Sequence, residues 1–347
     1  MEQPVLRLGL VGFSNADTQS IVLAMAQIFR FNEGRPRWEL TDFEQADAWC
    51  IRGGSVQRLP GNQVLVNTLI PRLPTITLDP KEIARPIAFT APLPAGLEAS
   101  ELVNLTDPNL LRVSLQRFEA WLRPLRAQFS LGAQLVVREQ ELSQGVYHVL
   151  DTQSKLLAVI NLISWRVAMM PIAQPLDFED ASWVQRPAMA ADVPPGFLTI
   201  SVVQLMWIYA VRTEQDVLPA RYRKQKVYLR RLPNLPAGWV RDEHLVVLRA
   251  LSAAPAKFKD LQDTTALSDE SLARALAALY FSGAITTNAA SAMQIERKPS
   301  PVGGQSSLPP VSLAFALPET HYDMRNHPYP QSPLDITAPA PLFTPPR

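Results

Sequence analysis

Cysteine and histidine, which supply many metal ligands and catalytic nucleophiles or bases, are scarce in this sequence. The 347 residues include one cysteine and four histidines. With Cys50 as the only thiol, the chain can form neither an internal disulfide framework nor a cage of several thiolates around a metal. Two of the histidines, His321 and His327, lie near the end of the sequence. The sequence therefore contains few histidines from which an active site could be built.

An excess of charge and a long apolar run are lacking as well. The 33 basic and 32 acidic residues leave a net charge of +1, which argues against a protein that coats nucleic acid by charge alone. The longest apolar run, residues 156–171, is shorter than a bilayer span and contains Arg166, so two strands or a buried segment are favoured. Because the first residues show no signal-peptide pattern and thiols are scarce, we expect a cytoplasmic protein.

The N-terminal third alternates apolar runs typical of strands with helical patterns. The predicted strands are residues 5–13, 38–43, 48–54, 74–80 and 86–93. A helix is expected over 14–34, capped by Ser14 or Asn15, and another begins at Asp107-Pro108. The second carries a continuous apolar stripe and is expected to kink at Pro124, its apolar residues being Leu111, Leu115, Phe118, Leu122, Leu125 and Phe129. This order predicts a doubly wound α/β sheet.

Residues 90–93, Thr-Ala-Pro-Leu, look like the Thr-Lys-Pro-Phe that follows the last strand of response-regulator receiver domains. The resemblance covers about residues 4–128 and implies a flavodoxin-like fold. It also implies an acidic pair after the first strand, where this chain has Ser14 and Asn15, and a phosphoryl-accepting aspartate where it has Arg52. Ala91 replaces the lysine. Phosphoryl transfer needs those groups and a metal, so we predict a pseudo-receiver that is not phosphorylated.

A nucleotide site at the first strand–helix turn is a rival interpretation of the same segment. Residues 12–20, GFSNADTQS, contain neither the GxxxxGK[ST] nor the GxGxxG pattern, which makes this alternative weak.

The middle of the chain has patterns typical of a hydrophobic core and no recognisable catalytic or ligand-binding motif. Strands are expected over 134–142, 145–151 and 155–162, with a turn at Asp151–Ser154. Residues 198–213 predict a helix that is apolar almost all the way round, which is typical of a helix buried centrally or covered by a partner. His148 has no ligand nearby in sequence and is interpreted as a structural histidine. We predict no bound metal and no cofactor.

Residues 221–231, RYRKQKVYLRR, form a local positive patch without any acid. It contains two tyrosines among six cations, which are Arg221, Arg223, Lys224, Lys226, Arg230 and Arg231. In a strand, Lys226, Tyr228 and Arg230 would share one face. Three interpretations remain open: a solvated edge strand, a contact for an acidic protein, and a site for a cyclic dinucleotide or nucleic acid.

Residues 241–288 resemble a winged helix-turn-helix domain. Helices are expected over 242–252 and 256–265, and a third begins at the cap Ser268 and ends at Gly283. Between 241 and 285 there are five basic and six acidic residues, and Asp269 and Glu270 stand at the end that would meet a DNA groove. Phosphate neutralisation dominates DNA affinity, so this domain is predicted to pack or to bind protein instead.

These observations predict four regions: a pseudo-receiver-like α/β domain (1–128), a mixed α+β domain (129–240), a winged-helix-like domain (241–298) and a disordered proline-rich tail (299–347). The tail is either a solvated terminus or a docking segment. The whole is similar to an atypical bacterial response regulator. We therefore expect a non-enzymatic signalling regulator or adaptor that binds a protein partner. The alternative is a transcription regulator, or an effector that binds a cyclic dinucleotide or nucleic acid through residues 221–231.

Overall fold

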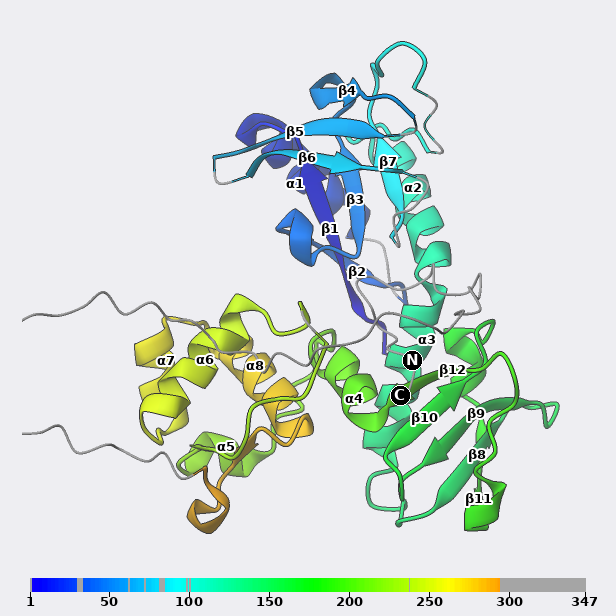
Figure 1. Ribbon diagram of the computed structural model, residues 1–347, viewed down its shortest axis with the longest axis vertical. Helices are drawn as coiled ribbons and strands as arrows, with labels where there is room; N and C mark the ends of the chain where they lie inside the picture. Colours follow the sequence, from blue (N-terminus) through cyan, green and yellow to red (C-terminus); the bar gives the residue numbers. More distant parts are fainter. Residues whose placement is uncertain are drawn as a thin grey trace, which may run out of the picture.

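The structure is a computed structural model, and it describes residues 2–29, 34–61, 63–71, 73–80, 85–97, 99, 101–236 and 238–293. The predicted proline-rich tail lies outside the described residues. Figure 1 shows an upper part built on a parallel sheet, a lower part built on an antiparallel sheet, and a group of helices beside the second sheet.

The upper part contains a parallel sheet with the strand order β2-β1-β3-β7, which we call the N-terminal sheet. Its strands are β1 (Val5–Val11), β2 (Arg37–Thr41), β3 (Ala48–Ile51) and β7 (Ile87–Phe89). Successive side chains of a strand point to opposite faces, so the sheet borders two cores. Leu6, Leu8, Cys50 and Ala88 belong to one core, whereas Val11, Ile51, Ile87 and Phe89 belong to the other.

Different elements cover the two faces of the N-terminal sheet. Helices α1 (Asn15–Phe29) and α2 (Pro108–Trp121) pack on the first face. The second face is covered by an antiparallel sheet made of β4 (Val56–Arg58), β5 (Val64–Ile70) and β6 (Leu73–Leu78). A mixed α/β fold with a parallel sheet is thus confirmed, but the strand predicted at 74–80 runs in this second sheet. In the described residues between β3 and β7 there is no α-helix, only a short 3₁₀ turn at Gly53–Ser55.

The helix expected from Asp107 is two helices. Asp107 caps α2 by accepting hydrogen bonds from the backbone N–H groups of Asn109 and Leu110. A break at Leu122 separates α2 from α3 (Arg123–Val137), whose first turn holds Pro124 without loss of a helical hydrogen bond. All six residues of the predicted apolar stripe are buried. The strand predicted at 134–142 is wrong, because α3 continues to Val137.

Five antiparallel strands in the order β11-β8-β9-β10-β12 form the central sheet. They are β8 (Val146–Leu150), β9 (Leu156–Asn161), β10 (Arg166–Met169), β11 (Ser182–Arg186) and β12 (Leu198–Ser201). The predicted turn is confirmed by the hydrogen bond from the Asp151 N–H to the Lys155 carbonyl (2.9 Å). His148 is half-buried, and its Nε2 lies 2.9 Å from the Ala190 carbonyl oxygen, a structural contact.

The apolar segment 198–213 divides into a strand and a helix. Residues 198–201 pair with β10 as β12, so α4 (Val202–Ala210) begins later than predicted. Its cap is Ser201, whose hydroxyl accepts the Gln204 N–H. As expected for a helix without a polar face, α4 is enclosed, and it lies between α3 and α8 (Figure 1).

The three helices predicted near the end of the chain are confirmed. The C-terminal elements are α5 (Ala220–Lys224), β13 (Tyr228–Leu229), α6 (Asp242–Ala253), α7 (Phe258–Thr265), α8 (Asp269–Phe281) and β14 (Ile285–Thr286). Ser268 caps α8, and Gly283 ends it with a positive φ of 67°. The partner of β14 is β13, which precedes the helices.

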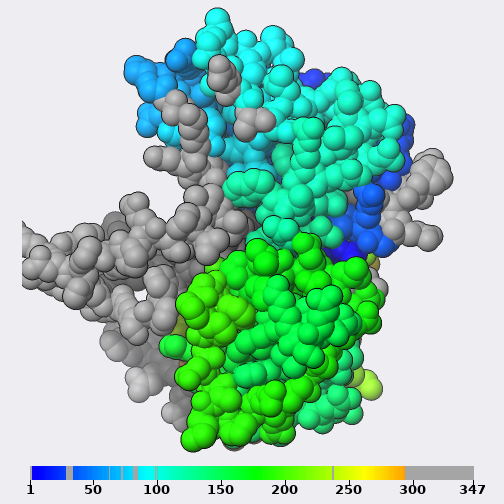
Figure 2. Space-filling model, turned by 90° about the vertical axis from the view of Figure 1, so that its right-hand side faces the viewer, coloured from blue at the N-terminus to red at the C-terminus, as the bar shows by residue number. Residues whose placement is uncertain are grey.

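One hydrophobic cluster runs through all three parts, from Leu6 to Ile285. The start of β1 is joined to the end of α4 by a 2.8 Å hydrogen bond from the Val5 N–H to the Arg212 carbonyl. Figure 2 shows the cyan upper part resting directly on the green central sheet. Helix α3 crosses residue 128, and the division of the chain into domains stays a prediction. Of the helices in the described ranges, none is long and apolar enough to cross a bilayer.

Candidate functional site

The residues predicted to occupy receiver positions lie at the carboxyl end of the N-terminal sheet, where parallel sheets place their ligand sites. Arg52 follows β3 and Ala91 follows β7, and both line one surface pocket of about 370 Å³. Gly53 lets these two loops approach closely, because a Cβ there would lie 2.1 Å from the Thr90 carbonyl oxygen. The Ala91–Pro92 peptide bond is cis.

Asp17 is the carboxylate of this pocket, and the sequence interpretation did not identify it. Ser14 and Asp17 cap the start of α1 reciprocally: the Ser14 hydroxyl donates to Asp17 Oδ2 (2.8 Å) and accepts the Asp17 N–H (3.2 Å). The hydrogen bonds from Ser14 are the main cause that lowers the pKa of Asp17, and the nearby Arg52 lowers it further. The capping pattern Ser-x-x-Asp was the signal that could have revealed it.

Arg52 neutralises this carboxylate. Its Nη1 lies 3.0 Å from Asp17 Oδ2, and both side chains are partly exposed. Four residues stand where the receiver resemblance implies other side chains. Of these, Ser14 and Arg52 both contact Asp17, and Ala91 lines the same pocket. Asn15 is the exposed first residue of α1. Within the described residues no group of three or more His, Cys, Asp or Glu side chains could hold a metal. The pocket thus contains an ion pair between Arg52 and Asp17.

The basic stretch is a short helix followed by a two-residue strand rather than one strand. Two of its arginines bond within the protein: Arg223 pairs with the side chains of Asp216 (2.7 Å) and Asp269 (3.2 Å), and Arg231 Nη2 donates to the backbone carbonyl of Ser282 (3.1 Å). Arg221 lies over the rings of Tyr222 and Tyr280.

The other cations of the stretch remain exposed. From Lys226 to Arg230 the side chains alternate, with Val227 and Leu229 buried and Lys226, Tyr228 and Arg230 directed outward. The predicted shared face is therefore present although the regular strand is short. Lys224, Lys226 and Arg230 form no ion pair with any residue in the described part of the chain.

Helix α8, which would read DNA in the predicted winged helix, is enclosed by the protein itself. It packs against α4 on one side and against α6 and α7 on the others. Every residue from 272 to 281 is buried or half-buried. Its exposed N-terminal end carries Asp269 and Glu270. The charge pattern was visible in the sequence, but the cover provided by α4 was not.

A second charged cluster joins residues that are far apart in the chain. Asp47 precedes β3 and is buried together with Arg212, which follows α4. Arg212 Nη1 and Nη2 each donate to one oxygen of Asp47 at 2.6 Å, and the Arg7 N–H donates to Asp47 Oδ2 (2.9 Å). This bidentate pair ties the N-terminal sheet to α4. No sequence motif connects residues 165 positions apart.

Comparison of the chain with family models, with curated proteins and with solved structures finds no match.

Proposed function

We propose that this protein is a non-enzymatic regulator or adaptor of the response-regulator type, and that it acts through contacts with another protein. The observation that carries the proposal is the ion pair between Arg52 and Asp17 at the carboxyl end of the N-terminal sheet. A cation in the position of the phosphoryl acceptor removes the nucleophile and occupies the remaining carboxylate. The flavodoxin-like receiver is then a docking scaffold rather than a phosphorylation switch.

The cover on α8 supports the same proposal for the winged-helix-like part. A recognition helix must present several side chains to a groove about 12 Å wide, and α8 has its middle and end packed against other helices. Its free end is acidic, which opposes contact with phosphates. We therefore propose that this part of the molecule stabilises the fold and does not read DNA.

An apolar groove on the upper part suits contact with a protein. Leu102, Leu110 and Val113 line a groove of about 380 Å³ beside α2, and they are 57%, 50% and 42% exposed. Arg117 lies at the same groove and pairs with Glu101. Apolar side chains gathered in an exposed groove with a polar edge are typical of protein-binding sites.

Phosphorylation and DNA binding can both be tested directly. The full chain is incubated with acetyl phosphate and Mg²⁺, and the intact mass is expected to show no phosphoryl adduct. Fluorescence anisotropy with duplex DNA at physiological salt is expected to show nothing tighter than nonspecific binding. An acid-labile adduct on Asp17 or another carboxylate, or sequence-selective binding, contradicts the proposal.

The partner side of the proposal is tested by affinity capture from the host, followed by mass spectrometry. The wild type is compared with the double variant Leu110→Glu/Val113→Glu, with Leu245→Glu as a matched control, because Leu245 is also exposed but lies on α6 outside the groove. The groove variant is expected to lose partners that the control retains. Deletion of residues 299–347 shows whether the tail takes part. Identical sets from all variants contradict the groove as the contact.

The second candidate function is an effector that binds a cyclic dinucleotide or nucleic acid through the basic stretch. The outward face of Lys226, Tyr228 and Arg230 favours it, since two unpaired cations flank a ring that can stack on a base. Calorimetry with cyclic dinucleotides tests it, with Arg230→Ala/Arg231→Ala as the variant that loses the signal. Absence of heat for the wild type removes cyclic dinucleotides as ligands, and a nucleic-acid role is tested with single-stranded RNA.

A further inference from the structure

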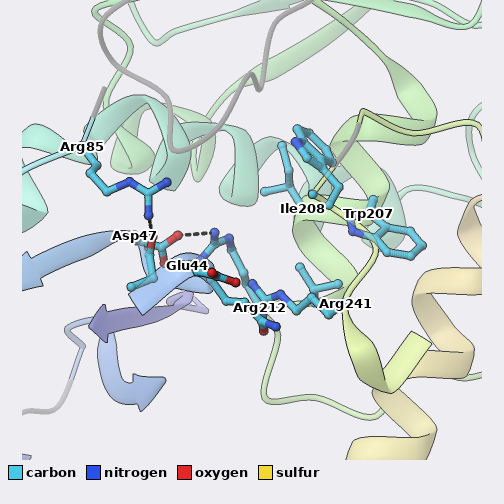
Figure 3. A pocket seen from close by; sticks show the side chains of 12 residues that line it. Glu44, Asp47, Arg85, Trp207, Ile208, Arg212 and Arg241 are labelled. Atoms are coloured by element: carbon cyan, nitrogen blue, oxygen red, sulfur yellow. Dashed lines mark hydrogen bonds and ion pairs between the residues drawn. The ribbon is translucent and has the colours of Figure 1, made fainter. Parts of the chain in front are cut away.

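A small cavity lies where the three parts of the molecule meet. Its volume is about 70 Å³. It is lined by the segment Glu44–Asp47 and Arg85 from the upper part, by α4 and Arg212, and by Gly238, Trp239 and Arg241 just before α6. Figure 3 shows Arg85 and Arg212 approaching Asp47 and its neighbour from opposite sides, with Trp207 and Ile208 on the far wall.

Three guanidinium groups from distant positions line this cavity, against two carboxylates. One carboxylate, Asp47, is already engaged by both Nη atoms of Arg212. The other, Glu44, is exposed and forms no ion pair with the described residues. Arg85 donates from Nη1 to the Ala46 carbonyl (2.7 Å) and stacks on Trp49, and Asp47 is the carboxylate whose charge acts on it.

Arg241 is the least compensated of the three. Its side chain forms no hydrogen bond or ion pair with any residue in the described ranges. Burial is the main cause that lowers the pKa of Arg241 to about 10, and Arg274 lowers it further whereas Glu243 opposes the shift. Burial also lowers the pKa of Arg85. Both half-buried guanidiniums give up part of their hydration, Asp47 and Glu243 act on them only from nearby, and neither forms an ion pair with a described residue.

Arg212 adds an unused donor at the same place. It is 6% exposed, and its Nε has no hydrogen-bond partner although both of its Nη atoms are occupied. A buried donor without a partner costs free energy, which an acceptor in the cavity would recover. The wall opposite is apolar, made by Trp207, Ile208 and Val211. Apolar walls exclude water and strengthen the attraction between a guanidinium and an anion.

We propose that this cavity binds a small oxyanion, a phosphate or carboxylate group held by Arg85, Arg212 Nε and Arg241. Arginine forks bind the oxygens of such groups through paired hydrogen bonds. The volume of about 70 Å³ suits one such group and is far below the roughly 300–1,000 Å³ of pockets that enclose whole drug-sized ligands. The bound group bridges the N-terminal sheet, α4 and the segment before α6, so it stabilises the junction of the three parts. This inference does not depend on the proposed function.

The test uses the full chain and inorganic phosphate, titrated at constant ionic strength against sodium chloride. Calorimetry and the tryptophan fluorescence of Trp207 and Trp239 are expected to show saturable binding, with a rise in the melting temperature that follows occupancy. Arg241→Gln and Arg85→Gln are each expected to weaken binding by about tenfold or more, the usual effect of losing a charged hydrogen-bond partner. Arg249→Gln, an exposed arginine on α6 itself, is the matched control and is expected to bind like the wild type.

Two further probes identify the source of the oxyanion. Acetate that binds as tightly as phosphate assigns the site to carboxylates, whereas adenosine monophosphate that binds more tightly than phosphate assigns it to a nucleotide whose phosphate enters the cavity. Absence of saturable binding by all three probes overturns the proposal. So does equal binding by the wild type, Arg85→Gln and Arg241→Gln. Circular dichroism establishes whether each variant is folded. If Arg241→Gln does not fold, Arg85→Gln still decides the test.

Discussion

The chain has two cationic regions, and they differ in almost every physical respect. The basic stretch, residues 221–231, gathers six cations within eleven positions, yet most of them are exposed, and Arg223 is neutralised by two aspartates. The arginine cavity gathers Arg85, Arg212 and Arg241, which are far apart in sequence; Arg212 is buried, and Arg85 and Arg241 are half-buried. Charge density along a sequence therefore says little about field strength, because burial and not number decides how strongly a cation acts.

The largest expected effect comes from removing the acid of the buried pair. Asp47→Ala leaves Arg212 and the N–H of Arg7 without their acceptor in a buried place, and it is expected to lower the free energy of unfolding by about 3–5 kcal/mol. Urea denaturation followed by circular dichroism measures it. A loss of unfolding free energy below about 1 kcal/mol would show that water reaches Arg212. The buried pair would then contribute no more than the exposed pairs of the basic stretch.

The buried histidine beside the cavity gives the next largest effect. Burial lowers the pKa of His244 to about 3, from an ordinary value of 6.5, and Arg241 contributes to the shift. The folded state thus keeps His244 neutral while the unfolded chain binds a proton below about pH 6.5, so stability falls as the pH drops through that window. The expected loss is about 1.4 kcal/mol per pH unit, or about 2 kcal/mol at pH 5.

Urea denaturation at pH 7 and pH 5 measures this dependence. His244→Gln is expected to flatten it, although the variant also loses the contact with Trp207 (4.7 Å between ring centroids) and is less stable at both values. His148→Gln removes the other histidine of the described residues and serves as the control for losing an imidazole in general. An unchanged slope in His244→Gln would contradict the assignment.

A smaller effect is expected for the ion pairs of the basic stretch. Asp216→Ala removes a 2.7 Å contact with Arg223 in which the aspartate side chain is 52% exposed, and Asp269 still pairs with the same arginine. Solvent screening limits the loss to about 0–1 kcal/mol. The same urea experiment checks it, and the loss is expected to shrink at high salt. A loss as large as that of Asp47→Ala would make the two regions equivalent.

The smallest effect is expected at the exposed cations. The double variant Lys226→Gln/Arg230→Gln changes side chains that pair with no described residue, so the free energy of unfolding is expected to stay within about 0.5 kcal/mol of the wild type. Thermal denaturation measures it. A clear rise in stability would reveal repulsion within the stretch, and a clear fall would reveal a contact that the exposed positions do not show.

Local patterns predicted the longer helices correctly and about half of the strands, whereas α5 and the strands β4, β5, β11 and β12 were not predicted. The stripe from Leu111 to Phe129, the caps Ser14, Asp107 and Ser268, and the stop at Gly283 are statements about neighbouring residues, and the structure bears them out. The errors fall where a local pattern is compatible with two structures. Residues 198–201 read as the first turn of a helix but pair with β10, because the edge of the central sheet satisfies their backbone groups.

The candidate sites divide in the same way. Ser14, Arg52 and Ala91 were named from the resemblance to receiver domains, and they lie around one pocket or its carboxylate. The sequence analysis missed Asp17, because a carboxylate near the start of a helix is explained by capping alone and gives no sign of a contact with Arg52. It missed the arginine cavity because Arg85, Arg212 and Arg241 are too far apart in sequence to form a recognisable motif. Neither the second sheet over the N-terminal sheet nor the cover on α8 has a local signature.

The amino-acid sequence by itself determined much of the secondary structure, the near balance of charge and the absence of a thiolate cage, because these depend on residue types and on spacings of a few positions. Only the tertiary structure decided which charged side chains are buried and therefore interact strongly with other charges. Packing against α4 encloses α8, and the junction of the three parts brings Arg85, Arg212 and Arg241 to one cavity. The dielectric around a charged side chain depends on the residues packed around it, which come from distant parts of the chain. It therefore cannot be inferred from a short stretch of sequence.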